Sequence, residues 1–358
     1  MWPYWLLFLI PAMAAVLKPH RQLGAQRRGL LEWDVSWFAM TCLVASMIGL
    51  RHEVGGDWGN YFAYLDEVRG ASFAEVVAKG DPGYNLINWL SSELGLGIYG
   101  VNLFCGVVLA AGLATLGRSL PRPWLSMTVA IPYLVIVVGM GYSRQGVALG
   151  FAMIGLAALQ RQATFWFVFW IILGATFHKS AVLLLPIAAL SSAKNKYWTA
   201  LWVGVVAIVA YQLLLEDAVE NLYVNYIEAQ YQSQGALVRV LMNAIPAALL
   251  LLWSRRFLLD PQAMRLWRWM AVLSLGLLFM LVVSPSSTAV DRIALYMLPL
   301  QMVVFAYLPE VVGSRQRSNQ KWVAAIVLYY ALVQFVWLNF AVHASGWLPY
   351  RFYPLETL

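Results

Sequence analysis

The feature that most constrains this chain is a series of long apolar runs that recurs from one end of the sequence to the other. A helix needs about 20 apolar residues to cross the hydrocarbon core of a bilayer, and irregular backbone exposed to lipid would leave its polar groups unpaired. The chain is 61% hydrophobic and 11% charged, whereas a soluble domain is roughly 45–50% apolar and about 25% charged. The sequence therefore predicts an all-α, polytopic integral membrane protein, with residues 1–358 forming a single membrane domain.

We expect about 12 transmembrane helices, some of them short or broken. The expected spans are Trp2–Leu17, Val35–Leu50, Tyr99–Leu116, Trp124–Met140, Gln145–Gln160, Thr164–Phe177, Ser180–Leu190, Tyr197–Leu215, Leu237–Trp253, Leu266–Ser284, Arg292–Leu308 and Trp322–Val342. Residues 51–97 are polar and acidic, and we expect them to form a periplasmic segment. Within this segment Tyr84–Leu94 has apolar residues at helical spacing, which predicts an interfacial or re-entrant helix that does not cross the membrane.

The segment Thr164–Leu190 decides the orientation of every later loop. As one long span, it would place the acidic residues 216–228 in the cytoplasm and the later arginines outside. As two short helices hinged at His178 and Lys179, it places the later basic loops in the cytoplasm, in agreement with the positive-inside rule. We therefore expect a hairpin here, and with it a periplasmic N-terminus and a periplasmic C-terminus.

The net charge of +7 does not indicate binding to nucleic acid, because most of the 24 Lys and Arg residues fall in short loops assigned to the cytoplasm. The expected outer side nevertheless keeps cations at the ends of spans. These are Arg51, Arg144, Lys179, Arg239 and Arg292. Cations on the outer side depart from the positive-inside rule, which indicates that a ligand at the outer face requires positive charge. Arg239 belongs to no motif, and we attribute it to topology alone.

Cations at the outer boundary suit a lipid-linked anion whose headgroup lies at that depth. A guanidinium group donates paired hydrogen bonds that match phosphate oxygens, so that a diphosphate can be held without a metal ion. Asp57, Asp81, Asp291 and His178 lie on the same expected side, and one of them could take the proton of an attacking hydroxyl. A cation clamp and a base are the minimum for glycosyl transfer from a polyprenyl-diphosphate sugar. We expect no cofactor and no metal site.

Several motifs then resemble the EpsG family, the Wzy-like polymerases of O-antigen and exopolysaccharide. In order, they are RHEVGGDWGNY at Arg51–Tyr61, DPGY at Asp81–Tyr84, SRQ at Ser143–Gln145, FHKSA at Phe177–Ala181 and RIALY at Arg292–Tyr296. The resemblance runs from about Trp2 to Tyr307. Asp81 departs from the family pattern, which usually has Glu before Pro-Gly. The resemblance implies polymerisation of undecaprenyl-diphosphate-linked oligosaccharide repeat units at the periplasmic face of the bacterial inner membrane.

These motifs supply the expected site residues. His178 and Asp57 are the expected catalytic residues, with His178 favoured as the base and Asp57 orienting the acceptor or the base. The positive charge of Lys179 is expected to lower the pKa of His178 and to favour its neutral form. The expected substrate-binding residues are Arg51, Arg144, Gln145, Lys179, Arg292, Tyr61, Asp81 and Tyr296. We expect Arg51, Arg144 and Arg292 to converge on one outward-facing cavity as a diphosphate clamp.

Each of these cations could also have a purely structural role. Arg144 and Lys179 could extend to lipid headgroups from the ends of their spans. Arg51 could pair with Asp57, and Arg292 with the adjacent Asp291.

Two enzyme functions and one transport function compete with the polymerase. The enzymes are an O-antigen ligase and another polyprenyl-linked glycosyltransferase. A glycolipid flippase is the third alternative, although it should carry charges deep inside several spans. The expected partners are the undecaprenyl-diphosphate-linked glycan, membrane lipids and a chain-length regulator protein, and no nucleic acid is expected.

Overall fold

The computed structural model describes residues 1–17, 34–78, 80–192, 196–214, 233, 235–284, 286–314 and 318–356. The predicted basic loop after the first span, most of the predicted acidic loop after Leu215, and the positions Lys79, Lys194, Arg315 and Arg317 lie outside the described residues. Within the described ranges the backbone is helical, and the β-type pairing is one isolated antiparallel bridge between Arg51 and Phe352. The prediction of an all-α membrane architecture is confirmed.

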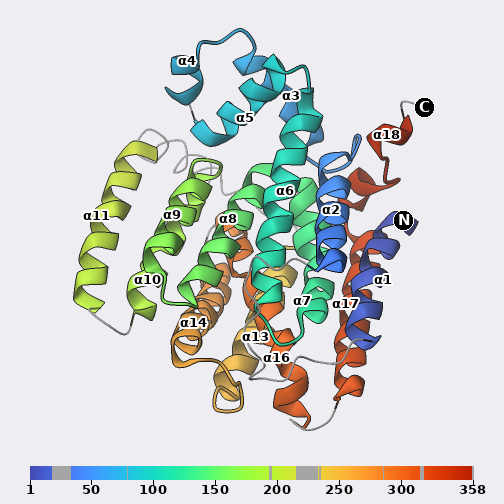
Figure 1. Cartoon of the computed structure of the whole chain (residues 1–358), viewed down its shortest axis with the longest axis vertical. Coiled ribbons are helices and arrows are strands. Elements are labelled where there is room, and N and C mark those ends of the chain that lie inside the picture. Colours follow the sequence, from blue (N-terminus) through green and yellow to red (C-terminus); the bar gives the residue numbers. More distant parts are fainter. Residues whose placement is uncertain are drawn as a thin grey trace.

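The apolar runs form a bundle of helices that run roughly side by side (Figure 1). In chain order, the bundle helices are α1 (Trp2–Leu17), α2 (Val35–Gly49), α6 (Gly97–Arg118), α7 (Pro123–Ala130), η1 (Ile131–Gly139), α8 (Ser143–Leu159), α9 (Thr164–Ala175), η2 (Lys179–Leu184), α10 (Leu185–Ser191), α11 (Lys196–Leu214), α13 (Ala236–Leu252), α14 (Pro261–Val283), α15 (Ser287–Ala294), η5 (Leu295–Met297), α16 (Pro299–Val312) and α17 (Gln320–Phe340). Every expected span corresponds to one helix or to two or three consecutive helices.

Only some of these helices are long enough to cross a bilayer by themselves. By length and hydropathy, three described helices qualify, α6, α14 and α17, and a fourth span is formed if the bent pair Ser287–Met297 and Pro299–Val312 is taken together. The others are apolar but shorter, as in α9, whose 12 residues rise only about 18 Å at 1.5 Å per residue. The chain is therefore a multi-pass membrane protein, while twelve crossings and the side of each terminus remain predictions.

The segment Thr164–Leu190 is broken at His178, as the sequence predicted, with α9 before the break and the consecutive helices η2 and α10 after it. α9 ends at Ala175, and η2 begins at Lys179 after a turn that contains His178. α10 then runs to the opposite end of the bundle (Figure 1). There the Ser191 carbonyl accepts a hydrogen bond from Arg265 Nε, near the start of α14, over 3.2 Å. The chain thus reaches its turn at His178 and reverses.

Three short helices form a cap over one end of the bundle (Figure 1). They are α3 (Trp58–Val68), α4 (Phe73–Ala78) and α5 (Pro82–Glu93). Two glycines allow the cap to approach the bundle closely. A Cβ at Gly55, whose φ is +107°, would lie 2.2 Å from the Met140 carbonyl oxygen, and one at Gly83 would lie 2.3 Å from Thr176 Oγ1. The Gly83 N–H also donates to the Thr176 carbonyl over 2.9 Å, which ties α5 to the end of α9.

The residues after α17 return to the same end of the bundle as the cap (Figure 1). They include η6 (Ala344–Trp347) and α18 (Tyr353–Glu356). The Gly346 carbonyl accepts from the Gly55 N–H at 2.8 Å, and the Arg351 carbonyl accepts from the His52 N–H at 3.0 Å. This segment therefore supports the loop between α2 and α3, which carries the first family-like motif.

Candidate active site

A polar cavity of about 240 Å³ lies where the cap meets the bundle. Its walls come from the start of α3, the start of α8, the turn before η2, and α15. The lining residues are Asp57, Asn60, Tyr61, Tyr64, Tyr142, Arg144, Gln145, His178 and Arg292. The N-termini of α3 and α8 both lie at the cavity, and their helix dipoles add positive potential there. The structure thus brings together six of the site residues expected from the sequence.

Arg144 is held in place by the carboxylate of Asp81 and by the ring of Tyr64. Its Nη1 lies 3.0 Å from Asp81 Oδ2, and its Cζ lies 4.6 Å from the centre of the Tyr64 ring. The carboxylate of Asp81 also accepts the backbone N–H of Lys179. Neither Asp81 nor Lys179 lines the cavity. Asp81 therefore positions Arg144 by joining the starts of α5, α8 and η2. Lys179, which we expected to bind the substrate, does not line the cavity.

Burial raises the pKa of Asp81, while Arg144 and then Lys179 oppose that shift. Asp81 lies in the cap, outside the membrane-spanning segments. Its side chain is 11% exposed, against 35% for that of Arg144. The charge that remains accessible to a ligand is therefore the guanidinium of Arg144 and not its carboxylate partner.

Arg292 is the second cation of the cavity, and it has no carboxylate within salt-bridge distance among the described residues. Its neighbour Asp291 pairs with Arg239 instead, through Nη2 and Oδ2 at 2.5 Å. The Cζ of Arg292 lies 4.3 Å from the centre of the Tyr142 ring. The alternative of a local Arg292–Asp291 pair is therefore wrong, because Asp291 is already occupied by a residue from α13.

Gln145 connects the two arginine-bearing segments. Its Nε2 donates to the backbone carbonyl of Arg292 at 2.7 Å. Its Oε1 is buried and has no hydrogen-bond partner in the part of the chain that the structure describes. A buried amide oxygen without a partner costs free energy, and in the cavity wall it offers an acceptor to a ligand hydroxyl.

Asp57 occupies the N-cap position of α3, but its side chain makes no capping hydrogen bond. It lines the cavity instead, facing the two arginines. Burial raises the pKa of Asp57, and the charges of Arg292 and Arg144 oppose that shift. The expected alternative of an Arg51–Asp57 pair is not present among the described ion pairs.

His178 lies in the turn between α9 and η2. Its Nδ1 is 2.6 Å from Ser180 Oγ, and that oxygen is 3.2 Å from the hydroxyl of Tyr296. When the Ser180 hydroxyl donates to Tyr296, its oxygen accepts from a protonated Nδ1, and Nε2 carries the lone pair of the neutral ring. Tyr296 is buried and does not line the cavity. It therefore orients His178 through Ser180 rather than contacting a ligand.

Burial, followed by the charges of Arg144 and Arg292, lowers the pKa of His178 well below its usual range. Lys179 is not among the causes, so the expected source of this shift was wrong. The neutral imidazole that we expected is supported by burial first, and then by the charges of Arg144 and Arg292.

Arg51 differs from the sequence expectation because its guanidinium is fully buried behind the cavity. It donates to the carbonyls of Val54 and Ile48, and its Nη2 donates to Ser143 Oγ at 2.9 Å and to Asn102 Oδ1 at 3.2 Å. Every nitrogen of the guanidinium is therefore used in joining α2, α6 and α8. Of the three arginines that we expected to converge on one cavity, Arg144 and Arg292 line the polar cavity and Arg51 does not.

Tyr61 contributes both to the wall and to its support. It lines the cavity, its hydroxyl accepts from the Ser143 N–H at 2.8 Å, and it donates to the Gly141 carbonyl at 3.2 Å. This hydroxyl holds the first turn of α8 in place, so that Arg144 and Gln145 face the cavity while Ser143 faces Arg51.

Asn60, Tyr64 and Tyr142 were not among the residues expected from the sequence. Asn60 and Tyr64 could have been found, because Asp57, Asn60 and Tyr64 recur at intervals of three and four residues on one face of α3. Tyr142 had no such signal, since only the fold places Arg292 over its ring. Within the described residues, no group of three His, Cys, Asp or Glu side chains could hold a metal ion.

Residues 34–352 match the family model described as the EpsG family. No match was found among curated proteins or among solved structures. The matched range contains every residue of the polar cavity and all of the sequence motifs described above.

Proposed function

Because this chain belongs to the EpsG family of Wzy-like polymerases, we propose that it is a glycosyltransferase that joins undecaprenyl-diphosphate-linked repeat units at the periplasmic face of the bacterial inner membrane. The observation that carries the proposal is the polar cavity, in which two arginines, a carboxylate and a neutral imidazole face one small space at the end of a membrane bundle. This set contains a clamp for an anion and two acceptors for a proton.

Arg144 and Arg292 would hold the diphosphate of the donor. Paired N–H donors match phosphate oxygens, and their interaction strengthens as charge develops on the departing group. Arg292 is the stronger candidate, because no described carboxylate pairs with it. Arg144 shares its charge with Asp81, so it would use the donors that Asp81 leaves open.

The reaction would form one glycosidic bond and break one sugar–phosphate bond. The hydroxyl oxygen of the acceptor sugar attacks the anomeric carbon of the donor, and the bond from that carbon to the diphosphate oxygen breaks. The diphosphate leaves with the electron pair, and the hydroxyl proton passes to Nε2 of His178. Asp57 would orient the acceptor by accepting a hydrogen bond from a neighbouring hydroxyl. No metal ion is needed to balance this step.

Burial, followed by the charges of Arg144 and Arg292, disfavours a protonated His178. A bound diphosphate would neutralise those charges and so raise the pKa of His178 toward the range of an effective base. The proposed base would therefore become more basic when the donor is in place. This coupling would limit proton transfer in the absence of substrate.

The direct test is to reconstitute the purified protein in liposomes with its lipid-linked repeat unit as the only substrate. A polymerase gives a ladder of glycans and releases polyprenyl diphosphate, whereas a ligase gives no ladder without a different acceptor. A flippase moves the glycolipid across the bilayer without forming a new bond. Absence of a ladder from folded protein, together with transfer across the membrane, would overturn the proposal. The predicted chain-length regulator can be added in the same assay, where it should narrow the ladder.

A further inference from the structure

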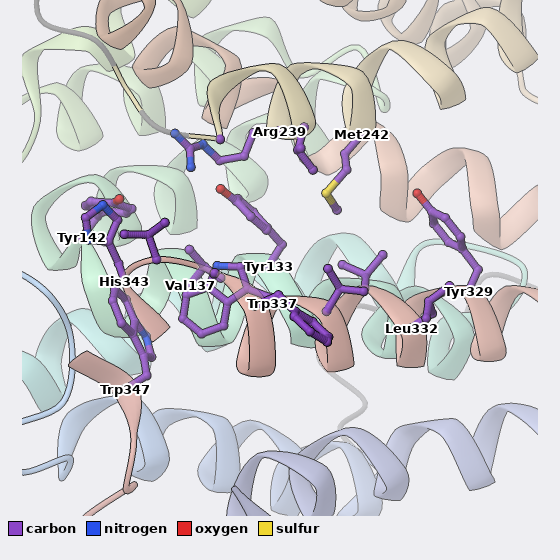
Figure 2. Close-up of a pocket in the computed structure, with 17 residues that line it drawn as sticks. Tyr133, Val137, Tyr142, Arg239, Met242, Tyr329, Leu332, Trp337, His343 and Trp347 are labelled. Carbon is purple, nitrogen blue, oxygen red and sulfur yellow. The ribbon is translucent and has the colours of Figure 1, made fainter. Parts of the chain in front are cut away.

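A second and larger cavity lies beside the polar one, and its chemistry is different. It has a volume of about 490 Å³ and runs between η1, α13 and α17 (Figure 2). Apolar side chains from these three helices form most of its walls, among them Val137, Met242, Leu332 and Val336. We call it the apolar groove. Its volume is within the range of about 300–1,000 Å³ that is usual for ligand sites.

The apolar groove is bordered by side chains that no described part of the chain covers. On α17, Leu332 is 57% exposed and Phe340 is 71% exposed, and on α13 Val238 is 61% exposed. In a membrane protein, such side chains face lipid. A chain in the bilayer can therefore enter the groove from the side, without passing through the cap.

One end of the groove meets the polar cavity. Tyr142 lines both spaces, and its ring carries the guanidinium of Arg292. Figure 2 shows Tyr142, Arg239 and His343 together at one end, with Tyr329 and Leu332 at the other. The groove thus has a polar end beside the proposed diphosphate clamp and an apolar length that leads away from it.

The wall at this end is unusually constructed. η1 is a π-helix of nine residues, and all of them are buried. π-helical turns are rare and often occur at functional sites. The Trp347 Nε1 donates to the Ile136 carbonyl at 2.8 Å, and the Trp347 carbonyl accepts from the Tyr4 hydroxyl at 2.7 Å. The C-terminal segment therefore fixes the wide helix whose side chains Tyr133 and Val137 face the groove.

The charges at the polar end of the groove indicate the kind of ligand that it can bind. Arg239 lies at the polar end, but its ion pair with Asp291 offsets its charge. Among the described residues, no carboxylate lies within salt-bridge distance of Arg292, whose Cζ lies 4.3 Å from the centre of the Tyr142 ring. An anion with an apolar tail would thus place its charge at Arg292 and its tail in the groove.

We propose that the apolar groove seats the first isoprene units of the polyprenyl chain of a lipid-linked substrate, with the diphosphate at the Tyr142 end. This inference rests on the proposed function. The rest of the chain would extend into the bilayer between α13 and α17. The polyprenyl chain gains little free energy on moving from lipid into the groove, because both surroundings are apolar. The groove therefore serves mainly to orient the diphosphate toward Arg292.

The first test fills the groove with a larger side chain. Val336→Trp on α17 and Val238→Trp on α13 should each raise KM for a repeat unit on undecaprenyl diphosphate by about tenfold. Neither should change KM for the same unit on methyl diphosphate, which carries no isoprene unit and does not enter the groove. Leu328→Trp is the matched control, since Leu328 is 71% exposed on α17 and does not line the groove. Equal effects on both substrates, or the same effect from Leu328→Trp, would overturn the inference.

The second test does not depend on turnover. Undecaprenyl diphosphate with a diazirine in its first isoprene units should cross-link to Met242 or Val336, and unlabelled undecaprenyl diphosphate should compete. Cross-linking that phosphatidylglycerol displaces equally well would identify a general phospholipid site and overturn the inference. Specific cross-linking without any glycan ladder would instead contradict the proposed polymerase function and leave the lipid site standing.

Discussion

The substitution Arg292→Lys separates a ligand-binding role for this residue from a structural one. The guanidinium has no carboxylate partner among the described residues, and the bond from Gln145 goes to the backbone carbonyl of Arg292, which the substitution keeps. Asp291 is paired with Arg239 and would not be left uncompensated. We therefore expect the free energy of unfolding to change by less than about 1 kcal/mol, as for most partly exposed positions.

The expected effect on turnover is much larger. Lysine keeps the charge but loses one of two paired bonds to phosphate, and a charge-assisted hydrogen bond is worth about 1.5–3 kcal/mol. It also loses part of the cation–π contact with Tyr142, at 4.3 Å, which is worth about 0.5–1 kcal/mol. The sum of about 2–4 kcal/mol corresponds to a decrease in kcat/KM of about 30-fold to 1,000-fold.

The assay is the initial rate of glycan formation in liposomes, with thermal unfolding measured on the same preparation. Arg69→Lys is the matched control, because Arg69 is exposed on the cap and pairs with Asp66, and a surface pair contributes about 0–1 kcal/mol. A decrease of less than about threefold for Arg292→Lys would refute the clamp. So would a large decrease that is matched by an equal loss of stability.

The remaining predictions concern Arg51, the base, pH and topology. Arg51→Lys should lower the free energy of unfolding by about 1.5–3 kcal/mol for each hydrogen bond of the buried guanidinium that lysine cannot replace, and denaturation in detergent measures this. His178→Gln should abolish polymer formation while retaining binding of the lipid-linked unit, whereas Asp57→Asn should retain partial turnover; the reverse result would assign the base to Asp57. Burial raises the pKa of Asp57, so that on acidification its ionised form is lost at a higher pH than that of an ordinary aspartate. Activity should therefore begin to fall at that higher pH as the solution is acidified, and Asp57→Asn should not show this decrease. In a background without Cys42 and Cys105, Lys196→Cys should not react with an impermeant thiol reagent in intact cells, and labelling from outside would contradict the predicted topology.

The sequence by itself determined the class of protein and the approximate helices. Apolar runs and their flanking loops are local properties of the chain, and in a bilayer they leave little choice but helices. The basic residues of the later loops also predicted the break at His178, because only a hairpin there satisfies the positive-inside rule. The family-like motifs also identified most of the polar cavity, including Asp57, Arg144 and Arg292.

Only the tertiary structure decided which of these charges faces a ligand. Arg51 and Arg292 look alike in sequence, since each is a cation at the end of a span. Arg51 is enclosed by carbonyls and by Ser143, which lies 92 positions away, whereas Arg292 is freed because Asp291 pairs with Arg239 from another helix. Whether a charge is satisfied depends on partners brought close by packing, and local spacing carries no information about partners that are distant along the chain.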